Sequence, residues 1–382
     1  MNNIITTDTQ VSYHNTNTGK IYYRGYDLEE LVNNCEYLEV AYLLIFGTLP
    51  TVKEFTEFKV SINSVSLLRE DMRKVFEGFP GHAHPMSVLI TTTSAMSGFY
   101  LDSVQSLADS KVNNVMIYRL LGKIPTIVAW SYKHFLGHPF TYPKNKFSYS
   151  QNLEYLLFSS PNENYIPKPI IHKTINKLLI LCSDFINSCS TSSVRVVGSS
   201  RTNVYSAISA GMSALWGGKH MVQTSSITEV LRSLERNQTT IDKVLNKLNE
   251  NHSKYDFIEK TSLNQDFEDF RRNKLRKIFE NLSFHYNSIQ WVEISKQLLL
   301  AIENDESLKE QGLKINIEGY FSLICNLMGL PKEMTPSIMS VGKLAGWVAH
   351  WKELIDQDNP PFIQSSSYVG KTDLNFVPIE DR

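Results

Sequence analysis

Two short segments of the sequence carry side chains with metal-binding or nucleophilic chemistry. His82 and His84 are separated by one alanine, and Cys189 lies between two serines. Imidazole and thiolate groups bind transition metals, and a thiolate is also a nucleophile. The histidine spacing is short for two ligands of one ion and no acidic residue lies nearby, so we predict no metal site. We expect Cys189 to be a small buried thiol, with a nucleophile as the alternative.

The chain has 382 residues, four of them cysteines, and its formal net charge is -1. The cysteines form no Cys-x-x-Cys pair, which argues against a zinc site or a disulfide framework and favours a reducing compartment. The near-zero charge argues against nucleic acid or an anionic membrane as a partner. The first residues do not resemble a secretory signal, and no run reaches the ~20 apolar residues of a membrane span. We therefore expect a soluble cytoplasmic protein.

Helical periodicity runs through most of the chain, while strand-like alternation is scarce. Asp27 is placed to cap a helix, and Pro85 and Pro125 are placed as helix starts for residues 85–99 and 124–137. Residues 194–217 are apolar and rich in small side chains, which suits a packed core or a subunit interface. We find no βαβ rhythm, GxGxxG motif or P-loop. The sequence predicts an all-α fold without a tightly bound cofactor.

The composition of the chain changes after residue 220. Residues 222–285 are polar, with Lys, Glu, Asn and Gln in excess, whereas residues 330–355 are apolar again. This shift predicts a smaller and more exposed layer of helices between two parts of a larger helical unit.

Eight segments, ordered along nearly the whole chain, carry a joint pattern: YRGYDLEEL (23–31), VAYLLIFGTLPT (40–51), AHPMSVL (83–89), KIPTIVAWSYKH (123–134), STSSVRVVGSS (190–200), SAISAGMSALWG (206–217), GLPKEMTPSIMSVGKLAGWVAHW (329–351) and YVGKTDLNFVPIEDR (368–382). Together these segments resemble the citrate synthase family. The resemblance implies an all-α homodimer in which a cleft between a large and a small domain closes on the substrate. It assigns residues 1–221 and 330–382 to the large domain and residues 222–329 to the small one, in agreement with the composition shift.

The family resemblance implies a reaction that joins an acyl-CoA, usually acetyl-CoA, to an α-keto acid, usually oxaloacetate. A carboxylate must remove a proton from the α-carbon of the thioester, and a donor must hold the enolate oxygen. His220 in GGKHMVQTS matches the family's enolate-holding histidine, and Glu318 in NIEGY takes the place of its catalytic aspartate. The structural alternatives are a histidine that caps a helix end and a glutamate in a salt bridge.

Four further positions concern the binding of the keto acid. Phe185 stands where the family has a ketone-polarising histidine, and phenylalanine cannot donate a hydrogen bond. Ile363 and Ser365 stand at two arginine positions that bind a substrate carboxylate. Arg382 is the counterpart of an arginine that the partner subunit sends into the cleft, or else a terminal arginine in solvent.

The family's third histidine has no counterpart in register, and neither has the arginine of its Asp-Pro-Arg motif. Arg271 and Arg272 lie near that position, and we expect them on a solvated helix face. A loop that contacts CoA is also missing from this part of the sequence. The departures from the family pattern gather at the positions that do chemistry, while the helix-building segments match.

Three functions are compatible with this pattern. The first is a diverged enzyme that keeps His220 and Glu318 and acts on a less anionic carbonyl compound or acyl thioester, with a CoA thioester as substrate. The second is a non-catalytic dimer that binds a metabolite or a partner protein. The third, ordinary citrate or 2-methylcitrate synthesis, conflicts with the replaced histidine and arginines.

Overall fold

The structure is a computed structural model of the chain. It describes residues 8–100, 110–185, 187–217, 222–252, 255, 257–260, 269–286, 290–357, 362 and 379, without the side chains of residues 110 and 222–226. Helices dominate these ranges, and the five strands found there have two to four residues each. The prediction of an all-α fold is confirmed.

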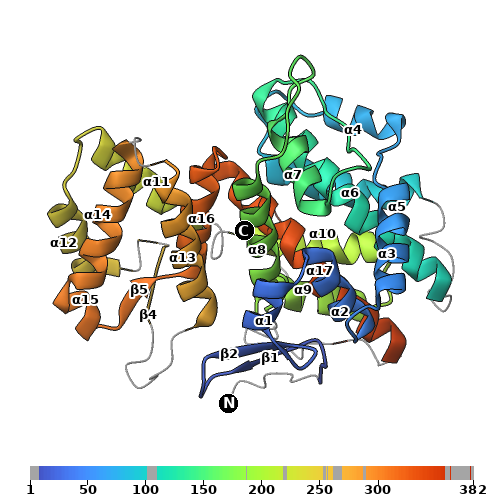
Figure 1. Ribbon diagram of the computed structural model, residues 1–382, viewed down its shortest axis with the longest axis horizontal. Helices are drawn as coiled ribbons and strands as arrows, with labels where there is room; N and C mark the ends of the chain where they lie inside the picture. Colours follow the sequence, from blue (N-terminus) through green and yellow to red (C-terminus); the bar gives the residue numbers. More distant parts are fainter. Residues whose placement is uncertain are drawn as a thin grey trace.

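The described helices form two groups that lie side by side in Figure 1. The larger group, on the right, also carries a three-stranded antiparallel sheet below α1, in the order β1-β2-β3. Its elements are β1 (Ser12–Asn15), β2 (Lys20–Tyr23), β3 (Tyr26–Asp27), α1 (Leu28–Asn34), α2 (Tyr37–Phe46), α3 (Val52–Ser64), the 3₁₀ turn η1 (Glu70–Met72), α4 (Arg73–Glu77), α5 (Pro85–Phe99), α6 (Ser110–Leu136), α7 (Tyr149–Phe158), α8 (Pro169–Leu181), α9 (Cys189–Ser199), α10 (Val204–Leu215), η4 (Lys332–Met334) and α17 (Thr335–Gln357).

The smaller group lies on the left in Figure 1 and is formed by the polar part of the sequence. Its two short strands pair antiparallel, with Ile258 opposite Ile315. Helix α13 contacts α8 of the larger group, and α16 contacts α17. The domain boundaries at residues 222 and 329 stay a prediction. The elements of this group are α11 (Val222–Glu235), α12 (Ile241–Asn251), β4 (Ile258–Lys260), α13 (Phe270–Phe284), α14 (Gln290–Asn304), α15 (Glu306–Glu310), β5 (Leu313–Ile315) and α16 (Ile317–Leu327).

Helix α17 is the centre of the larger group. Its residues are buried on all sides from Thr335 to Trp351, as expected for a helix that is apolar around its whole circumference. It packs against α2, α8, α9 and α10. A buried hydrogen bond from Tyr37 Oη to the Val341 carbonyl, 2.7 Å long, ties α2 to it. Helix α2 is thereby fixed against α17 by a buried polar contact as well as by packing.

Two glycines let α17 approach the end of α8. A Cβ atom on Gly342 would collide with Cys182 Sγ, and a Cβ atom on Gly346 would collide with the Ser183 carbonyl oxygen. The Gly346 amide also donates to that carbonyl, over 3.1 Å. The chain segment that follows α8 is therefore pressed against the middle of α17.

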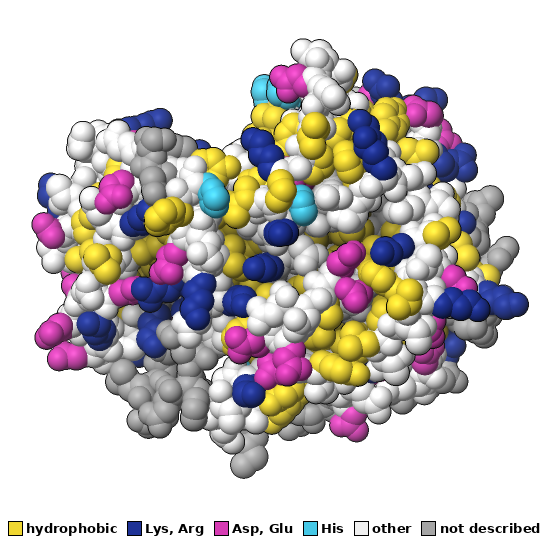
Figure 2. Space-filling view, in the orientation of Figure 1, with side chains coloured by type: hydrophobic (Ala, Val, Ile, Leu, Met, Phe, Trp, Pro, Cys, Tyr) yellow, Lys and Arg dark blue, Asp and Glu magenta, His cyan; other side chains and the backbone are white. Residues whose placement is uncertain are grey.

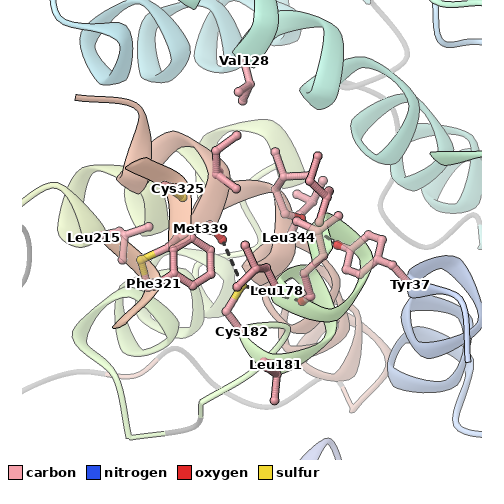
Figure 3. Packing of buried hydrophobic residues seen from close by; sticks show 14 of the residues in the cluster. Tyr37, Val128, Leu178, Leu181, Cys182, Leu215, Phe321, Cys325, Met339 and Leu344 are labelled. Atoms are coloured by element: carbon pink, nitrogen blue, oxygen red, sulfur yellow. Dashed lines mark hydrogen bonds between the residues drawn. The ribbon is translucent and has the colours of Figure 1, made fainter. Parts of the chain in front are cut away.

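Apolar side chains continue from the larger group into the smaller one. Figure 3 shows Phe321 and Cys325 of α16 beside Met339 of α17 and Cys182 at the end of α8. Cys182 Sγ lies 3.9 Å from the Met339 carbonyl oxygen. All four side chains are less than a tenth exposed. Apolar packing thus joins α16 to α17 and to the end of α8.

Local signals in the sequence gave correct helix starts at two places and a wrong one at a third. Asp27 caps α1, and α5 begins at Pro85 and ends at Phe99. The predicted start at Pro125 is wrong, because Pro125 lies inside α6. A proline leaves the carbonyl four residues earlier without its helical donor. Here the buried Tyr149 hydroxyl donates to that carbonyl, of Leu121, over 3.0 Å.

Candidate functional site

The segment after α8 carries Phe185, the first of the predicted site residues that the structure describes. Tyr23 holds this segment from the side of the sheet: its hydroxyl donates to the Asp184 carbonyl and accepts from the Asp184 amide, over 3.0 and 3.1 Å. Gly346 holds it from the side of α17. Phe185 is half-buried at the end of this fixed segment.

Asp184 begins a buried chain of polar groups beneath the site. It accepts hydrogen bonds from Ser12 Oγ and from His350 Nε2, over 2.5 and 3.1 Å. His350 Nδ1 accepts from Arg195 over 2.9 Å, because a guanidinium can only donate, so Nε2 carries the proton. Arg195 continues to Glu353 over 3.2 Å. Burial acts to raise the pKa of Asp184, but His350, Ser12 and Lys343 together hold the pKa below its usual value.

Arg271, near the start of α13, stacks on Phe185. Its guanidinium carbon lies 4.5 Å from the centre of the phenyl ring, in cation–π geometry. Asp269 caps α13 and binds one edge of the guanidinium, with Nε and Nη2 at 3.2 and 2.7 Å from its two oxygens. The other terminal nitrogen, Nη1, has no hydrogen-bond partner within the ranges given above. One donor edge of a buried arginine is therefore open.

Burial and charge act in opposite directions on Arg271. Burial lowers its pKa most strongly, but the charge and hydrogen bonds of Asp269, together with Tyr23 and Glu318, raise the pKa above its usual value. The same arrangement holds the pKa of Asp269 below its usual value. The guanidinium is 6% exposed, so the expectation that Arg271 lies on a solvated helix face is wrong. Arg272 is equally buried and pairs with Glu259, so that expectation is wrong for it too.

Lys343 is a second buried cation, on the face of α17 that meets the same segment. Its side chain is 7% exposed, and its ammonium group has no hydrogen bond or ion pair with any described residue. Burial lowers its pKa, and the charge of Arg271 lowers it further. Cys182, Asp184 and Glu318 lie close enough to raise it in part. Burying an ammonium group without a partner is costly.

Glu318, the second predicted site residue in the described ranges, lies in the first turn of α16. The Asn316 side-chain oxygen caps this helix by accepting from the Gly319 amide over 2.8 Å. The backbone amide of Asn316 donates to the Phe257 carbonyl over 2.9 Å. A helix N-terminus favours a carboxylate charge. Glu318 is half-buried, and among described groups its carboxylate has no hydrogen-bond donor. The alternative role in a salt bridge therefore finds no partner within hydrogen-bonding distance there.

These residues form one charged centre where the two groups of helices meet. Phe185 stacks on Arg271, and Glu318 raises the pKa of both Arg271 and Lys343, so the carboxylate is near both cations. Figure 2 shows Lys and Arg side chains gathered between the two groups on the face in view. We call Phe185, Arg271, Lys343 and Glu318 the central cluster. It can hold an anion on two cations beside a carboxylate that is able to accept a proton.

The remaining predicted site residues, His220, Ile363, Ser365 and Arg382, lie outside the described residues. Sequence analysis missed Lys343, although a single charged residue in the apolar run 335–351 was a usable signal. The expectation of a buried Cys189 is wrong, since it is exposed in the first turn of α9. In the described part of the chain, no group of three or more His, Cys, Asp or Glu is arranged to hold a metal ion. The helices described there include none long and apolar enough to cross a bilayer.

Comparisons with known proteins identify the family. The family model described as "Citrate synthase, C-terminal domain" matches residues 1–363. Citrate synthase 1 of Mycobacterium tuberculosis is 32% identical over 98% of this chain and 87% of its own length. Citrate synthase of Dictyostelium discoideum is 30% identical over 98% of this chain and 74% of its own.

Solved structures agree in fold. The crystal structure of citrate synthase from Pyrobaculum aerophilum matches with a TM-score of 0.85 and 23% identity, over 99% of this chain and 94% of that one. The citrate synthase from Thermoplasma acidophilum, solved as a ternary complex with carboxymethyl coenzyme A and oxaloacetate, matches with a TM-score of 0.85 and 19% identity, over 100% and 98% of the two chains. By the family model and the two relatives of 30% identity or more, this chain belongs to the citrate synthase family.

Proposed function

We propose that the protein is a condensing acyltransferase that joins a CoA thioester to a small carbonyl compound other than oxaloacetate. The central cluster carries this proposal. It offers two buried cations with open donors and a carboxylate without a partner, but an apolar ring, Phe185, where the family has a histidine. The cluster can therefore hold an anionic substrate, but Phe185 cannot polarise its ketone.

Glu318 is the base of the proposed reaction. The α-carbon of a thioester is weakly acidic, so a base without competing hydrogen bonds must lie next to it. Glu318 meets that requirement among described residues and is held by the cap of α16. Sequence matching proposes His220 as the donor to the enolate oxygen. Mutation of a single donor of this kind typically lowers the rate by about 10²–10³-fold.

Arg271 and Lys343 hold the carboxylate of the carbonyl substrate. Arg271 presents Nη1 while Asp269 fixes the opposite edge of the guanidinium, so little side-chain freedom is lost on binding. Lys343 supplies a point charge from the neighbouring helix. The substrate carboxylate thereby pairs with Nη1 of Arg271 and with the ammonium group of Lys343, which have no hydrogen-bond partner among described groups.

A thiol-release assay with acetyl-CoA tests the proposal. Oxaloacetate and a panel of other small carbonyl compounds serve as acceptors. We expect slow turnover with oxaloacetate, faster turnover with another acceptor, and loss of that turnover in Glu318→Gln. Glu310→Gln, an exposed change on α15, is the matched control and retains full turnover. Brisk citrate synthesis would refute the proposal.

The same assay distinguishes the condensing enzyme from the alternative, a non-catalytic pseudoenzyme. A pseudoenzyme would release no thiol with any acceptor in the panel and would be indifferent to Glu318→Gln. Calorimetry with acetyl-CoA gives a second measurement, because saturable CoA thioester binding argues against a purely regulatory dimer. Saturable binding together with turnover that depends on Glu318 would support the enzyme and exclude the pseudoenzyme.

We further propose a homodimer in a reducing compartment such as the cytoplasm. Val196 on α9 is 53% exposed, and α9 and α10 are rich in small side chains that permit close helix contact. The four cysteines are unpaired. Light scattering after size-exclusion chromatography tests the dimer, and Val196→Glu should shift the population towards monomer.

A further inference from the structure

The charges of the central cluster limit how many carboxylates a substrate can bring. Arg271 and Lys343 contribute two positive charges, while Glu318 of the cluster and its neighbours Asp269 and Asp184 contribute three negative ones. Negative charge therefore already faces both cations before a ligand binds. One carboxylate can be held by the two open donors, but a second finds no open cation among the cluster residues.

Phe185 defines what lies next to that carboxylate. Its ring is stacked on Arg271 and stays half-buried, so part of it borders the guanidinium that holds the anion. The ring has no donor for a second carboxylate or a hydroxyl group. A ligand group beside it must therefore be apolar to avoid an unpaired buried polar atom.

We infer that the acceptor is an α-keto monocarboxylate with an apolar side chain. This inference rests on the proposed function, since only a condensation requires a carbonyl carbon next to the bound carboxylate. The carboxylate lies on Arg271 and Lys343, the alkyl side chain contacts Phe185, and the keto carbon between them faces the donor activated by Glu318.

The reaction balances with water as the only further reactant. Glu318 removes a proton from the α-carbon of the CoA thioester, and that carbon forms a bond with the keto carbon. The keto oxygen takes up a proton from solvent and becomes a hydroxyl group. Water then cleaves the thioester and releases the CoA thiol, while the Glu318 proton returns to solvent. The product is an alkyl-substituted malate.

Three acceptors that differ in one feature each test the inference with acetyl-CoA as the donor. α-Ketoisocaproate has the carboxylate and an apolar side chain, oxaloacetate replaces the side chain by a second carboxylate, and methyl isobutyl ketone lacks the first carboxylate. We expect kcat/KM for α-ketoisocaproate to exceed that for the other two at least about 10-fold. Phe185→His should reduce the preference over oxaloacetate, whereas Phe185→Leu, which stays apolar, should keep it.

Calorimetry with α-ketoisocaproate alone gives a measurement that is independent of turnover. Binding should be lost in Arg271→Gln and retained in Arg276→Gln, a partly exposed arginine of the same helix that pairs with Glu280 and Glu303. If α-ketoisocaproate binding is lost in both variants, or retained in both, the assignment of Arg271 as the group that holds the carboxylate is overturned.

The outcomes separate this inference from the proposed function. Equal turnover of methyl isobutyl ketone would overturn the inference and leave the proposed function standing. Preference for oxaloacetate would overturn both. Binding of α-ketoisocaproate without turnover of any acceptor would refute the proposed reaction but uphold the ligand class. If the protein neither binds α-ketoisocaproate nor turns it over, the inference is overturned.

Discussion

Replacing Lys343 by methionine should make the protein more stable and weaken its binding of anions. Lys343 is 7% exposed and its ammonium group has no partner among described residues, so in the free protein its charge is a cost. Methionine fills a similar volume without a charge. A lysine that served the fold would give the opposite result, which makes Lys343→Met a sharp test of why the residue is there.

The expected magnitudes follow from the environment of Lys343. Substitution of buried ionic groups by apolar ones of similar size is often neutral or stabilising by about 1–4 kcal/mol. Because Asp184 and Glu318 partly offset the burial of Lys343, we expect the free energy of unfolding to rise by about 1 kcal/mol. A hydrogen bond to a charged group contributes about 1.5–3 kcal/mol, so the Kd for pyruvate should rise about 10- to 150-fold.

Urea unfolding and calorimetry with pyruvate measure the two effects. Lys352→Met is the matched control on the same helix, because Lys352 is partly exposed and pairs with Asp356 over 2.6 Å. It should change the free energy of unfolding by less than about 1 kcal/mol and leave pyruvate binding unchanged. If Lys343→Met instead lowers stability by more than the control does and binds pyruvate normally, the lysine belongs to the fold and not to a site.

Three further predictions concern pH and packing. The lowered pKa of Lys343 means that pyruvate affinity falls as pH rises through that pKa towards 10.5, and Lys343→Arg should move this loss to higher pH in calorimetric titrations. Gly346→Ala should lower the free energy of unfolding in urea by about 1–3 kcal/mol, because the added Cβ collides with the end of α8; an unchanged midpoint would contradict this packing. Asp269→Asn should lower the free energy of unfolding by about 1–2 kcal/mol at neutral pH. Because the folded-state pKa of Asp269 lies below 3.8, the difference in stability between the wild type and the variant should shrink as pH falls below 3.8. A constant difference down to about pH 3 would contradict the pair with Arg271.

Local sequence signals predicted the helices well where capping chemistry decides their ends. Pro85 begins α5 because a helix start has no use for the amide that proline lacks. Pro125 misled because a side chain far along the chain, Tyr149, supplies the missing donor. The apolar run 194–217 concealed a break between α9 and α10, where Arg201 takes a left-handed backbone and Asn203 starts a new helix. Such breaks depend on tertiary contacts that no local pattern records.

The sequence predicted two residues of the candidate site, but not which other side chains would lie next to them. Glu318 and Phe185 were found by matching short motifs, and the charges around them place both near Arg271. Arg271 was assigned to solvent because it lies in a basic, polar stretch, whereas in the structure α13 packs on α16 and α8 and the guanidinium stacks on Phe185. Cys189 was assigned to the core from the habits of its residue type, yet a helix start at the surface exposes it.

The buried chain from Asp184 to Glu353 bears on how far the central cluster can change. Asp184 is fixed by Tyr23, Ser12 and His350, and one of its oxygens still has no partner among described atoms. Such a network is costly to break, because each member leaves a buried polar group unpaired when another is removed. It holds the backbone before position 185 whatever side chain stands there. A phenyl ring in place of a donor at that position therefore alters the chemistry of the cluster without disturbing the segment that presents it, because the groups that support the segment are not the groups that face the cluster.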